Sequence, residues 1–487
     1  MNRRKSIRIS ILFFIGVISF FMHFKYFKED IKGIHVWRQT QTQSTIINFY
    51  EEDMNILNPR RNDRGDTDGI FRMEFPLMQW LVACSYKIFG NHLWICRILM
   101  FLTGIFSTIG IYKLLSALFD NDILSLIGAW AFTFSPVFYY YTINPMPDNL
   151  ALCCSIWGMA LFFKWTRNNR LSMLLLSGLL LSLGALCKLP FIIYYAVPFV
   201  HFFPVIIKNG IDRKSGLNMV VVFGFIVFPA AWYLTIIPQW KGNIIVKGML
   251  SNEESFSQIL DYLQHNLIST LPELLLNYGS VIFFLAGFYF LFRRKAYNDS
   301  RFPLLLTWGT AVVAYYLFEV NAIKKVHDYY LFPFLPLLFI IVSYGAYNLF
   351  NQSTIGRYIT ILLLLLLPVT CHLRIQGRWH PEKLVFNEDL ITYKQELRNA
   401  VPGNSLVVAG NDESRCIFFY HIGKKGWGFD NNNLTAPQLL SMIEKGAEYL
   451  YSDSRMIDEN EDIKPMLKEL ILETGSVRVY VLQKPSP

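Results

Sequence analysis

The sequence predicts an all-α, polytopic membrane protein with about eleven spans, followed by a small C-terminal α/β domain. Aromatic and aliphatic residues make up 53% of the 487 residues and only 17% are charged, which is too apolar for a soluble protein of this size. Apolar runs long enough to span a membrane recur from Ile9 to Leu373. From Arg374 onward, short strand-like and helix-like segments alternate instead.

The first apolar run, Ile9 to Phe24, follows a basic N-terminal stretch and has no small-residue cleavage site after it. We therefore expect a retained first span with a cytoplasmic N-terminus and a long outer loop over residues 25–95. Within that loop, the apolar stretch from Phe75 to Phe89 is too short to span and is expected to lie at the membrane interface.

The positive-inside rule gives the orientation of the remaining spans. They are expected at 97–118, 123–143, 149–166, 172–187, 190–207, 216–237, 276–292, 302–320, 333–350 and 357–373. Alternate counting places Arg167–Arg170, Lys208–Lys214 and Arg293–Lys295 in the cytoplasm, and the weak point is Lys324–Lys325, which falls on the outer side. The sequence thus predicts a multi-pass protein of the inner (plasma) membrane with an extracytoplasmic C-terminal domain.

The chain is therefore expected to divide into a membrane domain, residues 1–373, and a soluble domain, residues 374–487. In the second domain, the expected strands are Ser405–Gly410, Cys416–Tyr420, Glu448–Tyr451 and Val477–Leu482. The expected helices are Thr435–Lys445, with Thr435 as N-cap, and Ile463–Thr474. The stretch Gly423–Gly428 has no nucleotide-binding spacing and is expected to be a turn-rich loop.

Charge and cysteine usage exclude two classes of function. The net charge of +9 comes from short basic clusters at the ends of spans, so it indicates membrane orientation and not a nucleic-acid partner. The seven cysteines lie mostly within or beside apolar segments, without metal-ligand spacing or a paired framework. We expect them to be small buried apolar residues.

Residues suited to chemistry gather on one face of the predicted bundle. The outer face receives the segments His35–Gln39, Glu74–Pro76, Pro147–Asp148 and His327–Tyr330. Almost no charged residue is predicted at mid-span, since Lys113 and Lys164 sit near span ends, and no internal repeat is visible. A transporter or flippase would need polar groups along a path through the bilayer, so chemistry at the outer face is the better interpretation.

The ordered motifs resemble the GT-C glycosyltransferases, in the branch with protein O-mannosyltransferases (family 39) and lipid A aminoarabinose transferases. The matching stretches are His35–Thr42, Asn58–Arg60, Glu74–Trp80, Lys87–Gly90, Asn144–Asp148, Cys187–Pro190 and His327–Pro333. The resemblance covers residues 1 to about 373. It implies transfer of a hexosyl or pentosyl group from a polyprenyl-phosphate carrier to a glycan, lipid or protein acceptor of the cell envelope, outside the cytoplasm.

The resemblance also implies roles for particular residues. Relatives carry an acid at the position of Glu74, a lysine near the carrier phosphate at Lys188, and tyrosines lining the carrier site at Tyr329 and Tyr330. They usually also have a catalytic aspartate early in the first loop. Here that stretch, Trp37–Gln39, has no acid, and the nearest titratable residues are upstream: Glu29, Asp30 and His35.

The chemistry of such a transfer is simple, because a lipid phosphate leaves as a stable anion. It needs cations to hold the phosphate and a base to take the proton of the acceptor hydroxyl. Arg38 and Lys188 are the expected phosphate ligands. Glu74 and Asp148 are the expected acids, one as base and the other shaping the site. Direct attack of the hydroxyl on the anomeric carbon inverts that carbon.

Each candidate residue also has an ordinary structural explanation. These are an ion pair with Arg72 for Glu74, a helix N-cap for Asp148, stacking on Trp37 for Arg38, snorkelling for Lys188, an interfacial aromatic belt for Tyr329 and Tyr330, and polar loop positions for His35 and His327. A divalent cation held by Glu74 with histidines such as His35, His327 or His265 is a weak further option, because the ligands lack a recognisable spacing. The alternative function is a lipid-linked glycan polymerase or ligase with a pyrophosphate-linked donor, which predicts more outer-face arginines than this chain shows.

Overall fold

The computed structural model describes residues 3–209, 212–240, 247–248 and 254–485. Contacts within the chain divide it into two compact units. Unit 1 contains Met1–Glu29, Met73–Phe75 and Cys96–Gln376, and unit 2 contains Asp30–Arg72, Pro76–Ile95 and Gly377–Pro487. The sequence-based division near residue 373 follows chain order, whereas these units follow contacts, so most of the first loop belongs with the C-terminal region.

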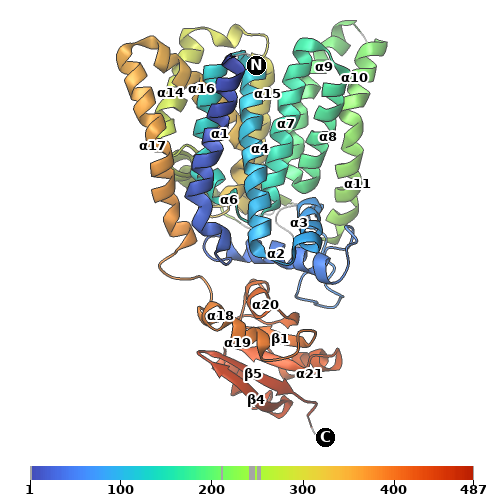
Figure 1. The fold of residues 1–487 in the computed structure, drawn as a ribbon. Coiled ribbons are helices and arrows are strands. Elements are labelled where there is room, and N and C mark those ends of the chain that lie inside the picture. Colours follow the sequence, from blue (N-terminus) through green and yellow to red (C-terminus); the bar gives the residue numbers. More distant parts are fainter. Residues whose placement is uncertain (1–2, 210–211, 241–246, 249–253, 486–487) are drawn as a thin grey trace. The chain divides into compact units, whose positions relative to one another are not determined.

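Unit 1 is built from helices, most of which run side by side as a bundle (Figure 1). Its α-helices are α1 (Arg3–His23), α4 (Leu93–Phe119), α5 (Asp122–Thr133), α6 (Pro136–Tyr141), α7 (Pro147–Asn168), α8 (Leu171–Cys187), α9 (Ala196–Asn209), α10 (Arg213–Phe223), α11 (Val227–Ile236), α13 (Phe256–His265), α14 (Gly279–Arg293), α15 (Phe302–Ile323), α16 (Leu335–Gln352) and α17 (Thr354–Trp379). Tighter or wider helical turns connect them: η1 (Phe24–Lys28), η2 (Leu189–Tyr195), η3 (Gly224–Ile226), η4 (Ile237–Gln239), η6 (Asn266–Leu275), η7 (Ala296–Asn298) and η8 (Asp328–Phe334).

Many of these helices are long and apolar enough to cross a membrane. Among the described residues six qualify by length and composition: Ser6–Lys28, Leu93–Phe119, Arg213–Gln239, Phe302–Ile323, Asp328–Gln352 and Thr354–Trp379. A bent pair, Phe256–Leu275 with Gly279–Arg293, makes seven if it counts as one span. Other expected spans correspond to shorter apolar helices such as α5 and α8. The predicted polytopic helical fold is confirmed.

Small residues allow the helices of unit 1 to approach closely. Where α7 packs on α8, a Cβ at Gly158 would lie 2.8 Å from the side chain of Leu181, and a Cβ at Gly184 would collide with Ser155. Packing of this kind, driven by close contact and not by water exclusion, is typical of helices in lipid. It fixes α7 against α8, so that Asp148 at the start of α7 lies beside Lys188 at the end of α8.

Unit 2 combines the first loop with a small α/β fold. Its helices are α2 (Val36–Glu51), α3 (Leu77–Phe89), α18 (Asp389–Thr392), α19 (Lys394–Asn399), α20 (Ile417–Ile422), α21 (Ala436–Glu444), α22 (Arg455–Asp458) and the turn η9 (Lys464–Met466). Its strands are β1 (Leu406–Gly410), β2 (Lys425–Gly428), β3 (Tyr449–Ser452), β4 (Leu467–Thr474) and β5 (Val477–Leu482). They form one sheet in the order β2-β1-β3-β5-β4, with β1 parallel to β2 and β3 and with the other pairs antiparallel.

The predicted strands Ser405–Gly410, Glu448–Tyr451 and Val477–Leu482 correspond to β1, β3 and β5. Thr435 is the N-cap of α21 as predicted, in a reciprocal capping box with Gln438. The prediction for Cys416–Tyr420 was wrong, because this segment begins α20. The Asp412 carboxylate accepts from the Phe418 N–H at 2.9 Å, and Gly423, at φ 63°, ends the helix.

Two further predictions in this region were wrong. Residues 463–474, expected to be helical, form η9 and then β4, because Gly475 and Ser476 make a two-residue turn that pairs Thr474 with Val477 in a hairpin. The expected loop Gly423–Gly428 instead contains β2, an edge strand that pairs with β1. A glycine-rich edge strand carries little side-chain pattern, so the sequence gives only a weak signal for it.

The first loop packs directly on the C-terminal fold within unit 2. Ile31 and Val36 share a small apolar core with Ile417 and Tyr420, which joins α2 to α20. The loop also extends the sheet, because Asp63 forms a parallel bridge with Gly426 beside β2. An exposed edge strand invites pairing with another chain, and here the protein's own loop covers part of that edge.

Candidate functional site

Lys188 is the centre of a polar cluster in unit 1. It ends α8 in an extended conformation and starts η2, with its backbone N–H donating to the Gly184 carbonyl at 3.0 Å. Its Nζ lies 3.4 Å from Oδ1 of Asp148, and 4.8 and 5.5 Å from the ring centroids of Tyr330 and Tyr329. The Asp148 carboxylate and two aromatic faces therefore lie close to this ammonium.

Asp148 lies in the first turn of α7, where the helix dipole favours a negative charge. It is not the N-cap, as the sequence suggested, because Met146 occupies that position and Pro147 is the first helical residue. The side chain is only 2% exposed, against 12% for Lys188. Its Oδ2 has no hydrogen-bond partner among the described residues. A buried carboxylate with an open acceptor is suited to a polar group of a bound substrate.

Glu74 is held beside the end of α8 by its neighbours. The Phe75 N–H donates to the Leu186 carbonyl at 3.1 Å, and the Trp232 indole N–H donates to the Met73 carbonyl at 3.0 Å. The ring of Phe75 also packs edge-on against Trp232, with 5.1 Å between centroids. Glu74 is half-buried, and its charge and that of Asp148 both act on the Cys187 thiol, the residue that precedes Lys188.

The segment His327–Tyr330 completes the cluster. Nδ1 of His327 lies 2.7 Å from the Ala322 carbonyl, which can only accept, so Nδ1 carries the hydrogen and Nε2 is left as an acceptor. Burial lowers the pKa of His327, which favours this neutral form. The imidazole packs edge-on against both tyrosine rings, with 5.9 and 5.8 Å between centroids. The Tyr141 hydroxyl donates to Asp328 at 2.7 Å and fixes the start of η8.

Glu319 is a residue of this cluster that the sequence interpretation missed. It lies on α15 one turn after Tyr315, whose hydroxyl donates to the Tyr330 carbonyl at 3.1 Å, and its charge acts on Lys188. The side chain is buried, and Oε2 has no hydrogen-bond partner among the described residues. A glutamate inside an apolar run was the available signal, since buried ionisable residues in spans are costly and usually functional.

Arg97 is a second buried charge that the sequence interpretation did not use, and its role is structural. One guanidinium nitrogen donates to Oδ1 of Asn144 at 2.8 Å, and the other donates to the Glu29 carbonyl at 3.0 Å. Asn149 also braces this turn, through a 2.6 Å hydrogen bond to the Tyr141 carbonyl. These bonds fix the segment that leads into α7 and thereby position Asp148.

The other candidates of the first loop belong to unit 2. His35 precedes α2 with a left-handed backbone, φ 56°, and Arg38 on that helix is buried, with Nη1 donating to the Gln41 side chain at 2.8 Å. Asp30, one of the acids nearest to the missing aspartate, forms an ion pair with Lys394 and accepts from the Tyr420 hydroxyl at 2.9 Å.

Asp30 is a poor candidate for the catalytic base. Burial would raise its pKa, but the charges of Lys394 and His421 and the hydrogen bonds from Lys394 and the Ile31 N–H together outweigh burial and hold the pKa at about 2. Such a carboxylate is too weakly basic to take a proton from a hydroxyl near neutral pH.

The metal option gains no geometric support. His265 is the last residue of α13. Over residues 3–209, 212–240, 247–248 and 254–485, no group of three or more histidine, cysteine, aspartate or glutamate side chains is arranged to hold a metal ion.

Comparison with known proteins supplies a partial family match and a fold. Residues 74–233 match the family model described as dolichyl-phosphate-mannose-protein mannosyltransferase, and no curated protein sequence matches the chain. The crystal structure of ArnT from Cupriavidus metallidurans has a TM-score of 0.61 at 11% identity, over 98% of this chain and 97% of ArnT. The chain has the GT-C fold.

Two more distant structures with this fold are similar to the chain. The Archaeoglobus fulgidus oligosaccharyltransferase has a TM-score of 0.55 at 13% identity, over 92% of this chain and 69% of that one. The mycobacterial arabinofuranosyltransferase AftD has a TM-score of 0.59 at 13% identity, over 99% of this chain and 40% of AftD. Within this chain, Glu74, Asp148 and Lys188 lie inside the segment that matches the family model, whereas Glu319 and His327–Tyr330 lie outside it.

Proposed function

We propose that this chain is a membrane glycosyltransferase that moves a hexosyl or pentosyl group from a polyprenyl-phosphate donor to an acceptor of the cell envelope. The observation that carries the proposal is the half-enclosed Lys188 ammonium, paired with Asp148 and faced by two tyrosine rings. An ammonium in surroundings of low polarity binds a lipid phosphate more strongly than an exposed lysine does. ArnT of C. metallidurans, whose fold is similar, has been solved with undecaprenyl phosphate bound.

The cluster favours a monophosphate donor over a pyrophosphate-linked one. Among the described residues of the cluster, Lys188 supplies one ammonium, and burial favours neutral His327. The guanidinium of Arg97 is engaged by the backbone and by Asn144, so it adds no second phosphate ligand. A polymerase or ligase that uses a pyrophosphate donor needs more positive charge than Lys188 provides.

The proposed reaction assigns separate work to the two acids. Asp148 is tied to Lys188 and positions it, so the base role falls to Glu74. The acceptor hydroxyl oxygen attacks the anomeric carbon, and the bond from that carbon to the phosphate oxygen breaks, leaving its electron pair on the phosphate. Glu74 takes the hydroxyl proton while Lys188 balances the phosphate charge. Attack opposite the leaving group inverts the anomeric carbon.

Sidedness is part of the proposal. The basic connections 167–170, 208–214 and 293–295 favour a cytoplasmic N-terminus, which puts the cluster and the C-terminal fold on the extracytoplasmic side of the plasma membrane. The acceptor is then a glycan, a lipid or a protein of the envelope.

The decisive experiment incubates the purified protein in detergent with a panel of radiolabelled polyprenyl-phosphate sugars, with and without envelope extract. We expect one donor to be turned over, and Glu74→Gln to lower the turnover by about a hundredfold or more. Turnover that survives both Glu74→Gln and Asp148→Asn would remove the proposed mechanism. If no donor of the panel is turned over and a pyrophosphate-linked glycan binds instead, the protein is better assigned as a polymerase or ligase.

A further inference from the structure

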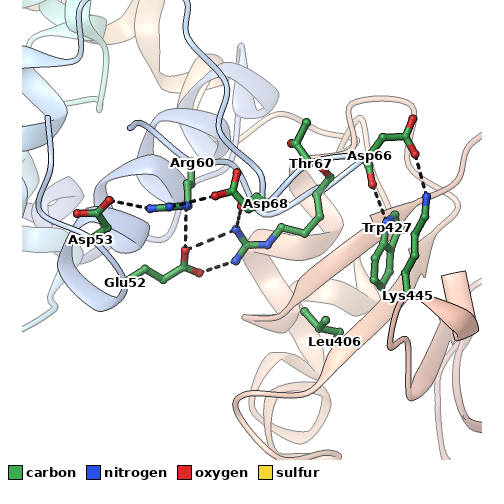
Figure 2. A pocket seen from close by; sticks show the side chains of 11 residues that line it. Glu52, Asp53, Arg60, Asp66, Thr67, Asp68, Leu406, Trp427 and Lys445 are labelled. Carbon is green, nitrogen blue, oxygen red and sulfur yellow. Dashed lines mark hydrogen bonds and ion pairs between the residues drawn. The ribbon is translucent and has the colours of Figure 1, made fainter. Parts of the chain in front are cut away.

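Unit 2 contains a cavity of about 670 Å³ that no part of the proposed reaction uses. The first loop supplies one wall, with residues between 52 and 68, and the C-terminal fold supplies the other, with Leu406, Trp427 and Lys445 (Figure 2). Its volume lies within the range of small-molecule sites in proteins. The fold has therefore built a ligand-sized space from two segments far apart in the sequence.

The charged groups of this cavity are already matched to one another. Arg60 donates to Asp53 and to Asp68, each at 3.1 Å, and Arg64 pairs with Glu52 at 2.5 Å (Figure 2). At the rim, Nζ of Lys445 lies 2.8 Å from Oδ1 of Asp66. A strongly charged ligand would have to break one of these ion pairs. Leaving one charge of the pair without its partner costs free energy and weakens binding of such a ligand.

A neutral ligand rich in hydroxyl groups has no such cost. Each carboxylate oxygen has two lone pairs, so the paired acids can still accept from hydroxyl groups. The Thr67 hydroxyl donates to the Arg64 carbonyl at 3.0 Å and accepts from the Gly69 N–H at 3.1 Å, so it can offer only its second lone pair to a ligand. Leu406 and Trp427 add an apolar surface to this polar wall. The indole N–H of Trp427 donates to the Gly65 carbonyl at 2.8 Å, which fixes the ring. Sugars combine these two needs, because their hydroxyl groups point outward from an apolar C–H face.

We propose that this cavity binds neutral sugar units of the acceptor glycan, away from the hydroxyl that reacts. The assignment to the acceptor rests on the proposed function, whereas sugar binding itself rests on the cavity. An acceptor with several sugar units can be held at a distance from its reacting end, and binding energy from remote units lowers the acceptor KM.

The test uses the full-length protein in detergent and a double variant, Asp68→Asn with Lys445→Ala. The side chains are 58% and 45% exposed, and Arg60 keeps its bond to Asp53, so the fold should persist. The matched control is Glu461→Gln with Lys464→Ala, a surface pair in the same unit, 86% and 48% exposed, that does not line the cavity.

Saturation-transfer NMR with maltose, lactose, cellobiose and chitobiose measures binding directly, with glucuronic acid and glucosamine as charged comparisons. We expect at least one neutral disaccharide to bind the wild type and the control variant equally, and to bind the cavity variant about tenfold more weakly. Absence of binding to the wild type, equal binding to both variants, or preference for a charged sugar would each overturn the cavity assignment.

A second readout separates the cavity from the proposed reaction. With envelope extract as acceptor, the cavity variant should raise the acceptor KM about tenfold and leave donor hydrolysis without acceptor unchanged. Donor turnover with an unchanged acceptor KM would overturn the acceptor assignment while the transferase stands. No donor turnover at all, with cavity-dependent sugar binding, would overturn the transferase and its acceptor while the sugar site stands.

Discussion

The cluster around Lys188 and the cavity beside Trp427 use charge in opposite ways. Around Lys188, a few charges are buried among apolar helices, and the oxygens Oδ2 of Asp148 and Oε2 of Glu319 lack hydrogen-bond partners within the described part of the chain. In the cavity, many charges lie at a partly exposed surface and pair with one another. The cluster around Lys188 thus has carboxylate oxygens that can still accept hydrogen bonds, whereas the charges of the cavity are already paired with one another.

This contrast indicates what each region can do. A buried charge interacts strongly with anything that enters, because little water screens it, so a few such groups are enough to stabilise a charged transition state. Exposed pairs contribute little each and are screened by salt, so they suit weak recognition of a neutral ligand. Substitutions around Lys188 should therefore have larger effects than substitutions in the cavity.

The largest effect is expected for Lys188→Met, which keeps the apolar stem and removes the charge. Sugar transfer should fall on the order of a thousandfold, because the phosphate loses its cation and Asp148 is left buried without a partner. Lys188→Arg should retain part of the activity. The measurement is kcat/KM with the donor identified by the panel.

The control for this prediction is Lys464→Met, which removes a lysine that pairs with Glu461 and is 48% exposed. Its effect should stay within about threefold, as for an ordinary surface pair. Equal losses of kcat/KM in the two lysine variants would show that Lys188 has no role in transfer beyond that of an ordinary surface lysine. The contrast between the two regions would then be wrong.

The two acids should separate in their kinetics. Glu74→Gln should lower kcat by about a hundredfold or more with little change in the donor KM, as expected for the loss of a general base. Asp148→Asn should act mainly on the donor KM, because it releases Lys188. In a double-mutant cycle, Asp148→Asn should add little in the Lys188→Met background. The reverse split would exchange the roles of the two acids.

The sequence predicted the helical bundle well, because long apolar runs have one stable outcome in lipid. It was less informative for the C-terminal fold. The run Cys416–Tyr420 is apolar throughout, so its pattern cannot distinguish a buried strand from a buried helix. The side-chain bonds of Asp412 make it a helix, and that interaction depends on the folded loop.

The candidate site was predicted in its residue types but not in its pairings. Asp148 and Lys188 are forty positions apart, and only the packing of α7 on α8 brings them to 3.4 Å. Their assignment to catalysis stays a prediction. Glu319 was missed because averaging hydropathy over a span hides one charged residue. The mutual pairing of the first-loop arginines and acids could not be predicted, because it requires the loop to be folded.

Glu319→Gln should have an intermediate effect, a fall of about tenfold in kcat/KM, since it exchanges a buried charge near Lys188 for a neutral group of the same shape. The control is Tyr315→Phe, which removes the 3.1 Å bond to the Tyr330 carbonyl and leaves Glu319 in place. If Tyr315→Phe lowers activity as much as Glu319→Gln, the effect reports the packing of α15 and not the charge. Thermal unfolding of both variants checks that the fold is retained.

The smallest effect is expected at Asp30, where a satisfied ion pair in unit 2 should contribute stability and no chemistry. The lowered pKa of Asp30 means that its contribution is fully present above the unfolded pKa near 3.8 and is lost as pH falls through about 2. Burial lowers the pKa of Lys394, which means that the folded state destabilises its ammonium form and offsets part of the stabilisation of the Asp30 carboxylate. We therefore take the net contribution of the ion pair to the free energy of unfolding to be on the order of 1 kcal/mol.

Asp30→Asn should therefore reduce stability at pH 6 by about this amount and leave donor turnover unchanged. The difference from the wild type, measured by thermal unfolding in detergent, should shrink between pH 4 and pH 2. Buried His421, whose pKa is lowered to about 3, destabilises both proteins as pH falls below its unfolded value near 6.5, so the comparison rests on the difference between the two curves. A large loss of turnover in Asp30→Asn, with stability unchanged, would make Asp30 the missing base of the first loop and place chemistry in unit 2.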